Sequence, residues 1–403
     1  MRQVLDGLKV ADFTWYAAGP YVTRYLALFG AKVVKIETSA RPDGTRTIAP
    51  YKDGKPGLNR SGGFAFFNPN KHGVTLNLKH PRGTEVAKRI VAWADVVADN
   101  FATGRMQEMG LGYEALRKIK PDLIVLSSTN QGQTGPHARQ PGFGIQLECL
   151  SGFVHLIGWP DRGPVVHSGL LTDLIAARFA VVAILGALDY RRRTGKGQYI
   201  DLSQYQCGLQ FLAPLLLDFK LNGRVADRVG NRCPSAAPCG VYPCRGDDRW
   251  CAISVLDDIQ WRGLTQAMGE PSWAGEPRFS MLLTRKENED ELDSLLGEWT
   301  SNFVVEEVAM LLQRHNVPAG VVKNSQDIYH DPQLAHRQQW KDLPHSELGS
   351  HRGDYPGFIL SKTPGELKTS APLLGQDNEY FYTKLLGMSD EEFLDLLNSG
   401  ALQ

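Results

Sequence analysis

Residues 168–203 read SGLLTDLIAARFAVVAILGALDYRRRTGKGQYIDLS and contain the longest apolar run of the chain. Between Leu174 and Leu188 only Arg178 and Gly186 interrupt the apolar and alanine residues. This pattern has no polar face, so it predicts a helix buried on nearly all sides at the centre of the fold. The run is too short to span a bilayer and contains an arginine, and we therefore expect no membrane partner.

One ionisable residue, Asp173, stands beside Thr172 in the first turn of this expected helix. A carboxylate there meets free backbone N–H groups and the positive end of the helix dipole, which should keep it ionised. Asp173 is therefore a helix cap or a nucleophile, and from the residues alone a cap is the more common role.

The composition is typical of a soluble globular protein. The 403 residues are 42% hydrophobic and 22% charged, and 44 basic residues balance 44 acidic ones, so no global field favours nucleic acid. The first residues, MRQVLDGLKVADF, lack the apolar core of a signal peptide. Six cysteines in a chain of this length suit a reducing compartment better than a disulfide framework, and we expect the cytoplasm.

The N-terminal half predicts a Rossmann-like α/β domain. A strand at Leu8–Phe13, a helix that ends at Phe29, Gly30 and a strand at Lys32–Glu37 form a βαβ unit with parallel strands. Further strands, separated by helical segments, are expected at residues 74–78, 95–98, 123–127 and 199–202.

The remaining segments predict a long loop, a smaller domain and a linker. Residues 38–70 are rich in Gly, Pro, Arg and Asn and should form a functional loop. Residues 256–316 alternate helical patterns with charged turns, as a separate smaller domain would. From residue 330 onward the frequent Pro, Gly and His indicate an extended linker, and a last helix at Asp390–Leu397 follows the start signal Ser389.

Motifs for nucleotide cofactors and common hydrolytic sites are missing. Glu37 ends the second strand, where dinucleotide-binding folds place an acid for a ribose, but the preceding turn lacks G-x-G-x-x-G. The sequence also lacks a P-loop, a G-x-S-x-G elbow and an H-E-x-x-H motif. We expect no NAD and no ATP-driven ligation.

Four cysteines, Cys233, Cys239, Cys244 and Cys251, gather within nineteen residues and raise the question of zinc. The gap between Cys239 and Cys244 comes near the spacing of a zinc site. The alternation in CGVYPC and CAISV instead favours thiols that serve as small buried hydrophobes, and we expect no metal.

Basic residues lie near the expected strand ends. Lys71 and Lys79 bracket the strand at 74–78, and Arg46 and Arg105 stand in loops. Ligands of open α/β sheets bind at the carboxyl ends of strands, so these side chains either hold the phosphates of a large anionic ligand or are solvated surface charges.

Eleven segments, in order along the chain, together resemble the class III coenzyme A transferases. This family includes formyl-CoA:oxalate and carnitine CoA-transferases and, with different chemistry, the α-methylacyl-CoA racemases. The matching segments are LDGLKVADFTWYAAGP (5–20), LFGAKVVKIE (28–37), NPNKHGVTLNLK (68–79), ADVVADNF (94–101), GLGYEAL (110–116), NQGQTGP (130–136), PGF and LSGF (within 141–153), Asp173 with ALDYRRRTGKGQYIDLS (187–203), VPAGVV (317–322), DPQ (331–333), and PLLGQDNE with LLGMSDEEF (within 372–393).

The resemblance implies the fold and the assembly. It implies an α/β protein with a large Rossmann-like CoA-binding domain built from both chain ends and a smaller α+β domain, in a dimer whose protomers interlock like linked rings. The boundaries would be 1–222 for the first part of the large domain, 223–328 for the small domain, and 329–403 for the linker and the return to the large domain. A homodimer and a heteromer with a related family subunit both remain open.

The resemblance also gives Asp173 a covalent role. In the family an aspartate precedes by fifteen residues the leucine of an A-L-x-x-R segment, as Asp173 precedes Leu188 here. The family's transferases use this carboxylate to attack the donor thioester, giving an aspartyl–acyl anhydride and then an aspartyl-CoA thioester. The implied activity moves CoA from a donor such as succinyl-CoA to an organic acid, with CoA as substrate and no tightly bound cofactor.

The family's CoA contacts carry over to matching positions. They are Ala17, Ala18, Leu76, Asn77, Leu78, Lys79, Asn100, Phe101, Ala102, Arg105, Thr129, Asn130, Gln131 and Gly132. Two CoA-contacting arginines of the formyl-CoA enzymes are replaced by Thr38 and Glu108, and Arg41 or Arg105 would have to substitute. Residues 233–240 replace a glycine-rich substrate loop, so formate and oxalate are not expected.

Phe143 distinguishes this chain from the racemases. These enzymes have a histidine at that position as their second acid/base, and a two-base proton exchange cannot proceed without it. A racemase or epimerase is therefore the alternative, beside a non-catalytic CoA-binding subunit of a heteromeric transferase. Apolar and aromatic residues in WYAAG, FAFFNPN and GFG leave room for an aromatic or branched acyl group.

Overall fold

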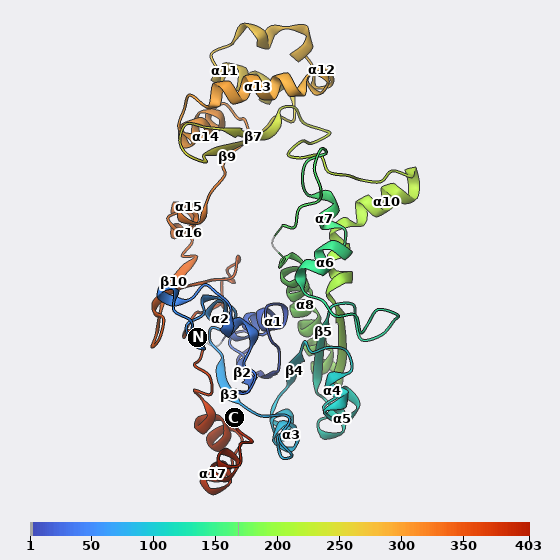
Figure 1. The fold of residues 1–403 in the computed structure, drawn as a ribbon, viewed down its shortest axis with the longest axis vertical. Helices are drawn as coiled ribbons and strands as arrows, with labels where there is room; N and C mark the ends of the chain where they lie inside the picture. The colour runs from blue at the N-terminus through green and yellow to red at the C-terminus, as the bar shows by residue number, and fades with distance from the viewer. Residues whose placement is uncertain (1–2, 168) are drawn as a thin grey trace. The chain divides into compact units, whose positions relative to one another are not determined.

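The computed structural model describes residues 3–167 and 169–403, and the chain forms two compact units (Figure 1). The larger unit contains the chain up to Val154, the segment Val166–Val225, and the chain from Gln333 onward. The smaller unit contains His155–Val165 and Ala226–Pro332. Ser168, in the apolar stretch quoted above, lies outside the described residues.

A parallel six-stranded sheet forms the centre of the larger unit. Its order is β3-β2-β1-β4-β5-β6, so the chain reverses direction across the sheet between β1 and β4. Every neighbouring pair is parallel, for example with Val10 opposite both Val33 and Val96. The strands are β1 (Lys9–Asp12), β2 (Lys32–Glu37), β3 (His72–Thr75), β4 (Val96–Asp99), β5 (Ile124–Thr129) and β6 (Gln198–Ser203). The predicted parallel α/β architecture is confirmed, except that β3 ends at Thr75.

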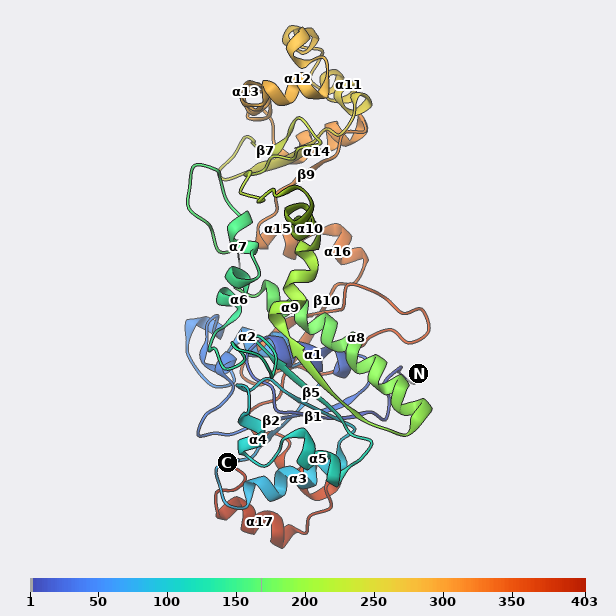
Figure 2. The same cartoon turned by 90° about the vertical axis from the view of Figure 1, so that its right-hand side faces the viewer.

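Helices cover both faces of this sheet, as Figure 2 shows. Successive residues of a strand point to opposite faces. Val10 therefore packs with α1 (Ala18–Leu28) and α8 (Leu171–Thr194), while Ala11 packs with α3 (Gly83–Trp93). The second face is also covered by α5 (Tyr113–Ile119), the helical segment Tyr380–Leu385 and α17 (Asp390–Asn398). The last part of the chain thus returns to the sheet formed by the first part.

Helix α8 differs from its predicted environment. Ala176, Ala180 and Ala187 are buried where the helix packs on α1 and the sheet. Phe179, Val182 and Leu185 are 40%, 68% and 44% exposed. The prediction of a helix buried on nearly all sides is therefore wrong, because one apolar face is covered within the chain and another is not. With 24 residues the helix also has the length and composition of a membrane span, contrary to expectation, but a core helix passes the same test.

The segment 38–70 is a packed part of the larger unit, and its prediction as a loop outside the core is wrong. It contains helix α2 (Gly62–Phe67) and the fully buried Arg46. Arg46 donates to both carboxylate oxygens of Glu37 and lies 3.5 Å above the centre of the Phe64 ring. Glu37 is thus occupied by an ion pair, as its position in a buried strand end requires.

The remaining elements of the larger unit are short helices and one hairpin. The helices are α4 (Arg105–Glu108), α6 (Gly144–Leu150), α9 (Gln204–Leu209) and α10 (Ala213–Asn222), with α7 (Phe153–Leu156) and α16 (Pro332–His336) at the boundaries of the unit. Strands β10 (Trp340–His345) and β11 (Gly349–Asp354) pair antiparallel, so the expected linker is partly ordered into a hairpin.

The smaller unit has its own core around a three-stranded antiparallel sheet. Cys244 and Cys251 are buried in this core with Leu264 and Leu296. The strands are β7 (Cys239–Pro243), β8 (Trp250–Ser254) and β9 (Ala319–Val321). The helices are α11 (Asp258–Ala267), α12 (Leu282–Glu287), α13 (Glu289–Thr300), α14 (Val305–Arg314) and α15 (Ser325–Tyr329).

Candidate active site

A cavity of about 1230 Å³ lies at the carboxyl ends of the central strands of the larger unit. Turns that follow the strands supply its walls: residues 15–18 after β1, 76–79 after β3, 100–103 after β4, and 128–130 at the end of β5. In open parallel sheets this edge, where the strand order reverses, is where ligands bind. The volume suits a ligand of nucleotide size.

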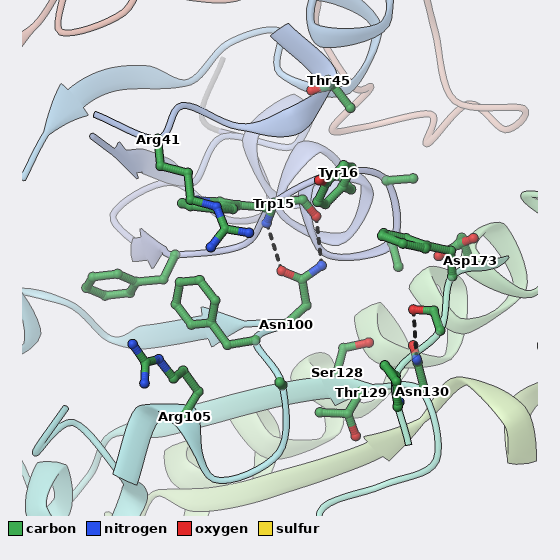
Figure 3. A pocket seen from close by; sticks show the side chains of 18 of the residues that line it. Trp15, Tyr16, Arg41, Thr45, Asn100, Arg105, Ser128, Thr129, Asn130 and Asp173 are labelled. Carbon is green, nitrogen blue, oxygen red and sulfur yellow. Dashed lines mark hydrogen bonds between the residues drawn. The ribbon is translucent and has the colours of Figure 1, made fainter. Parts of the chain in front are cut away.

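The turn after β1 is held in place by two side chains. Asn100 accepts the Trp15 backbone N–H and donates to the Trp15 carbonyl, both at 2.7 Å (Figure 3). Asp43 accepts the backbone N–H groups of Tyr16 at 3.0 Å and Thr45 at 2.9 Å. Tyr16 has a φ of 62°, a left-handed conformation that costs a bulky residue free energy and persists only where its surroundings enforce it.

Buried ion pairs support this turn from below. Lys35 Nζ lies 2.7 Å from Asp43 Oδ2, and Lys71 Nζ lies 3.0 Å from Asp12 Oδ2, with all four side chains fully buried. Burial lowers the pKa of the Lys71 ammonium to about 8, against the opposing effect of Asp12. Lys71 and Arg46 are therefore unavailable to an anionic ligand. Neither the prediction that they hold phosphates nor the alternative that they are solvated surface charges is right. A buried cation must be paired, and both are paired inside the protein.

One end of the cavity carries exposed positive charge. Arg41, Arg105, Arg139 and Lys79 all contribute to the lining. The Arg41 guanidinium lies 5.3 Å from the centre of the Trp15 ring, and Arg105 forms an exposed ion pair with Glu108 at 2.7 Å. Figure 3 shows Arg41 and Arg105 on the side of the cavity opposite Asp173.

Asp173 lies at the other end, as the third residue of α8. Leu170 precedes the helix as its N-cap residue, so Asp173 does not occupy the N-cap position. Its carboxylate accepts a hydrogen bond from its own backbone N–H in the first turn. A Cβ atom added to Gly144 would lie 2.3 Å from Asp173 Oδ2, which means that the carboxylate rests against the Gly144 backbone. Burial first, and then the nearby Glu148 carboxylate, raise the pKa of Asp173 to about 7. Burial and Glu148 therefore oppose the ionisation that the helix start was expected to favour.

Glu148, on α6, is the second acid at this end. Its side chain is fully buried, and its Oε1 accepts the Leu171 backbone N–H, at the start of α8, at 2.8 Å. Its Oε2 has no hydrogen-bond partner among the residues that the structure describes. The apolar segment GIQLECL gave no sign that its acid faces Asp173.

Most of the predicted ligand contacts meet in this one cavity. Of these residues only Gln131 and Gly132 are absent from the lining: the Gln131 amide donates to Gln140, and the Gly132 carbonyl accepts from Thr103. The contributors are Ala17, Ala18, Leu76, Asn77, Leu78, Lys79, Asn100, Phe101, Ala102, Arg105, Thr129, Asn130 and Asp173.

Several lining residues were not singled out from the sequence. They are Thr45, Ile48, Arg139, Leu170 and Gln204. Trp15, Tyr16 and Gly144 also line the cavity and belong to the segments WYAAG and GFG, which were expected to leave room for an acyl group. Phe143, the residue in place of a histidine, is 65% exposed, and its ring centre lies 5.6 Å from that of Tyr16. Trp15 and Tyr16 stand shortly after the first strand, where ligands of open α/β sheets bind.

Comparison with known proteins identifies the family. The pattern of "CoA-transferase family III" matches residues 5–378. The chain is 33% identical over 392 residues to the succinyl-CoA–D-citramalate CoA-transferase of Chloroflexus aurantiacus, covering 96% of this chain and 95% of that protein. It is 31% identical to the beta subunit of the succinyl-CoA–L-malate CoA-transferase of the same organism, over 97% of this chain and 96% of that subunit.

A solved structure is similar over nearly the whole chain. It is a CAIB/BAIF family protein from Brucella suis, with 31% identity and a TM-score of 0.88, and the match covers 96% of this chain and all of that one. The fold, the family pattern and these relatives agree with the resemblance read from the sequence. The chain belongs to CoA-transferase family III and is an enzyme with CoA-transferase activity.

Proposed function

We propose that this enzyme transfers CoA from a donor such as succinyl-CoA to an organic acid, with Asp173 as the covalent nucleophile. One observation supports the proposal: a half-buried carboxylate, without a cationic partner among the described residues, stands at one end of a cavity whose other end carries arginines. Donors of this kind are named in two of the relatives.

The chemistry needs neither ATP nor a metal. An Asp173 oxygen attacks the thioester carbonyl, the carbon–sulfur bond breaks, and the electron pair leaves on the CoA thiolate. The thiolate then attacks the aspartyl carbonyl of the anhydride, releasing the donor acid and forming an aspartyl-CoA thioester. The acceptor carboxylate repeats both steps in reverse, so each intermediate keeps an activated acyl bond.

The exposed basic end of the cavity would bind the CoA phosphates. Arg41 and Arg105 take over from the arginines that Thr38 and Glu108 replace, and Lys79 adds a third charge. Arginine is well suited to this task because its planar fork matches phosphate geometry. The stack of Arg41 on Trp15 offers a flat surface for an adenine ring.

Apolar side chains near Asp173 would receive the acyl group. Tyr16, Ile48, Phe143 and Leu170 line the cavity and are all at least one-third exposed, so an entering ligand would cover them. This lining supports an acid with an aromatic or branched carbon skeleton. Phe143 has no atom that can exchange a proton, which leaves racemisation without a second base.

Uncovered apolar surface supports an assembly of two chains. In addition to the exposed face of α8, helix α10 exposes Leu216, Leu217, Phe219 and Leu221 by 53% to 77%. Apolar patches of this kind mark interfaces. We propose a cytoplasmic dimer of two interlocked protomers, each with one large and one small domain. The partner protomer is a second copy of this chain or a related family subunit.

The test combines activity with chemical trapping. Succinyl-CoA or acetyl-CoA is incubated with a panel of carboxylic acids, and the acyl-CoA products are read by mass spectrometry. Hydroxylamine added during turnover should convert Asp173 to a hydroxamate in the peptide that contains it. Asp173→Asn should abolish exchange and trapping, whereas Asp189→Asn, an exposed acid on the same helix, should change neither.

Exchange at the wild-type rate by Asp173→Ala would exclude the covalent mechanism. Loss of α-deuterium from a 2-methylacyl-CoA, without exchange, would identify a racemase instead. Tight CoA binding with no exchange until a partner chain is added would identify a non-catalytic subunit.

A further inference from the structure

The buried acid Glu148 has no part in the transfer steps, yet it faces the nucleophile. Glu148 and Gly144 stand four residues apart on α6 and therefore share one face of that helix. The Gly144 backbone touches Asp173 Oδ2, and Glu148 Oε1 accepts the backbone N–H of Leu171, two residues before Asp173. This face of α6 thus fixes both the start of α8 and the surroundings of the Asp173 carboxylate.

The second oxygen of Glu148 makes this arrangement more than structural. Oε2 is buried without a hydrogen-bond partner among the described residues, whereas buried polar atoms are usually paired. A glutamine at this position would supply the same acceptor to Leu171. The negative charge is therefore not needed for the bond that Glu148 makes.

We propose that Glu148 is a positioning residue that raises the free energy of ionised Asp173 and thereby favours its acylation. The inference rests on Asp173 being the nucleophile. When Asp173 attacks, a carbon–oxygen bond forms, the carbon–sulfur bond breaks, and the negative charge leaves on the CoA thiolate. The neutral linkage left behind no longer opposes the Glu148 charge, so the like-charge repulsion is relieved in the covalent state.

The other charged and titratable groups near Asp173 do not compensate this repulsion. Helix α9, which packs on α6 and α8, carries Cys207, and burial raises the pKa of its thiol to about 11. Helix α1 carries Tyr21, whose pKa is raised to about 12, and Arg24, which pairs with Asp354. Arg178 on α8 is exposed and lies over the Tyr21 ring.

The experiment compares Glu148→Gln with wild type. The amide keeps an acceptor for the Leu171 N–H and removes the charge. We expect the acid limb of the kcat/KM profile to move to lower pH by about one unit. We also expect the fraction of enzyme trapped by hydroxylamine at saturating donor to fall several-fold, with CoA affinity unchanged. If Glu148 had only a structural role, Glu148→Gln would change neither the acid limb of the kcat/KM profile nor the ratio of trapped to free enzyme.

Two further variants complete the series. Glu148→Asp keeps the charge but withdraws it by one methylene, so its acid limb should lie between those of wild type and Glu148→Gln. Cys149→Ala, at an exposed neighbouring position on α6, should leave the profile unchanged.

Three outcomes would overturn the inference about Glu148, and a fourth would overturn the proposed function. An unchanged limb and an unchanged trapped fraction in Glu148→Gln overturn the inference, as does a limb that moves to higher pH. If Glu148→Gln does not fold, a limb of Glu148→Asp identical to that of wild type overturns it as well. Full exchange by Asp173→Ala would instead overturn the proposed function, so the two failures are distinguishable.

Discussion

Lys35 and Asp43 form a fully buried ion pair, 2.7 Å between Nζ and Oδ2, directly beneath the turn that begins the cavity. The same Asp43 carboxylate accepts the backbone N–H of Tyr16, which has left-handed dihedral angles. The pair therefore links the centre of the sheet to the conformation of a ligand-facing residue. Burial alone would raise the pKa of Asp43, but Lys35 and the backbone N–H groups of Thr45 and Tyr16 together hold that pKa below its usual value.

Lys35→Met should destabilise the protein strongly, because it leaves Asp43 charged and unpaired in the interior. We expect the free energy of unfolding to fall by about 3–5 kcal/mol. The loss should be read by urea denaturation at pH 7. Lys55→Met, at an exposed position, is the control and should lie within about 0.5 kcal/mol of wild type. Equal stability of the two variants would contradict the supporting role of the pair.

Gly144→Ala should inactivate the enzyme without unfolding it. The new Cβ would lie 1.9 Å from the Gly169 carbonyl oxygen and 2.3 Å from Asp173 Oδ2, so the carboxylate must move. A displacement of about 1 Å costs on the order of 100-fold in rate. Gly275→Ala, in the smaller unit, is the control, because a Cβ at this exposed position meets no atom within 4 Å. That variant should keep full activity and gain about 0.4–1 kcal/mol.

Arg41→Ala should weaken CoA binding and spare the chemical step. It removes a charge at the phosphate end and the stack on Trp15, far from Asp173 in the cavity (Figure 3). We expect KM for the acyl-CoA to rise about tenfold with kcat nearly unchanged, since one charged hydrogen bond is worth about 1.5–3 kcal/mol. Arg117→Ala, an exposed arginine on α5 paired with Glu114, should have no effect. A lower kcat at unchanged KM would place Arg41 elsewhere in the mechanism.

Asp173→Asn should stabilise the protein above neutral pH. The pKa of Asp173 is about 7 when folded and 3.8 in the unfolded reference, because burial and then Glu148 disfavour the charge. Its contribution to stability is complete below pH 3.8 and is lost as the pH rises through 7. The neutral variant avoids this loss, on the order of 2–4 kcal/mol before solvent screening reduces it, since one pKa unit corresponds to about 1.4 kcal/mol.

The measurement is the free energy of unfolding of both proteins between pH 4 and pH 9. The advantage of Asp173→Asn should grow from pH 4 to pH 7 and then remain constant. An advantage that shrinks with rising pH would mean that the carboxylate is stabilised in the fold rather than destabilised. Asp189→Asn should show no such gain, because Arg192 and Arg193 hold the pKa of Asp189 below its usual value.

The sheet was predictable because β1, β2, β4 and β5 are short segments rich in apolar residues, and because β1, α1 and β2 follow one another within thirty residues. Membership of the family followed from motifs in a fixed order. The environment of α8 was not predictable, because an apolar stripe looks the same whether the chain itself or another molecule covers it. The hydrophobic residues of a helix indicate that its burial is favourable, but they do not indicate which molecule covers the helix.

The predicted site was right where backbone turns form it and wrong where charge depends on tertiary partners. Ala17, Asn100 and Thr129 follow strands, so their position at one sheet edge follows from the topology. Arg46 and Lys71 lie in the segment between β2 and β3, where Glu37 and Asp12 bind them inside the protein. The pKa of Asp173 depends in part on Glu148, which lies twenty-five residues earlier in the chain. The local sequence around Asp173 does not indicate that these two carboxylates lie close together.

The two ends of the cavity are held in place by different residues, and this separation has a consequence for substrate selectivity. The turn at Trp15 and Tyr16 is fixed by Asn100 and Asp43, while the start of α8 is fixed by Glu148. On the proposed function, substitutions at Ile48 should therefore change which acid is accepted without disturbing either support. A scaffold built in this way would let the residues around the proposed acyl site vary independently of the proposed CoA site and of Asp173.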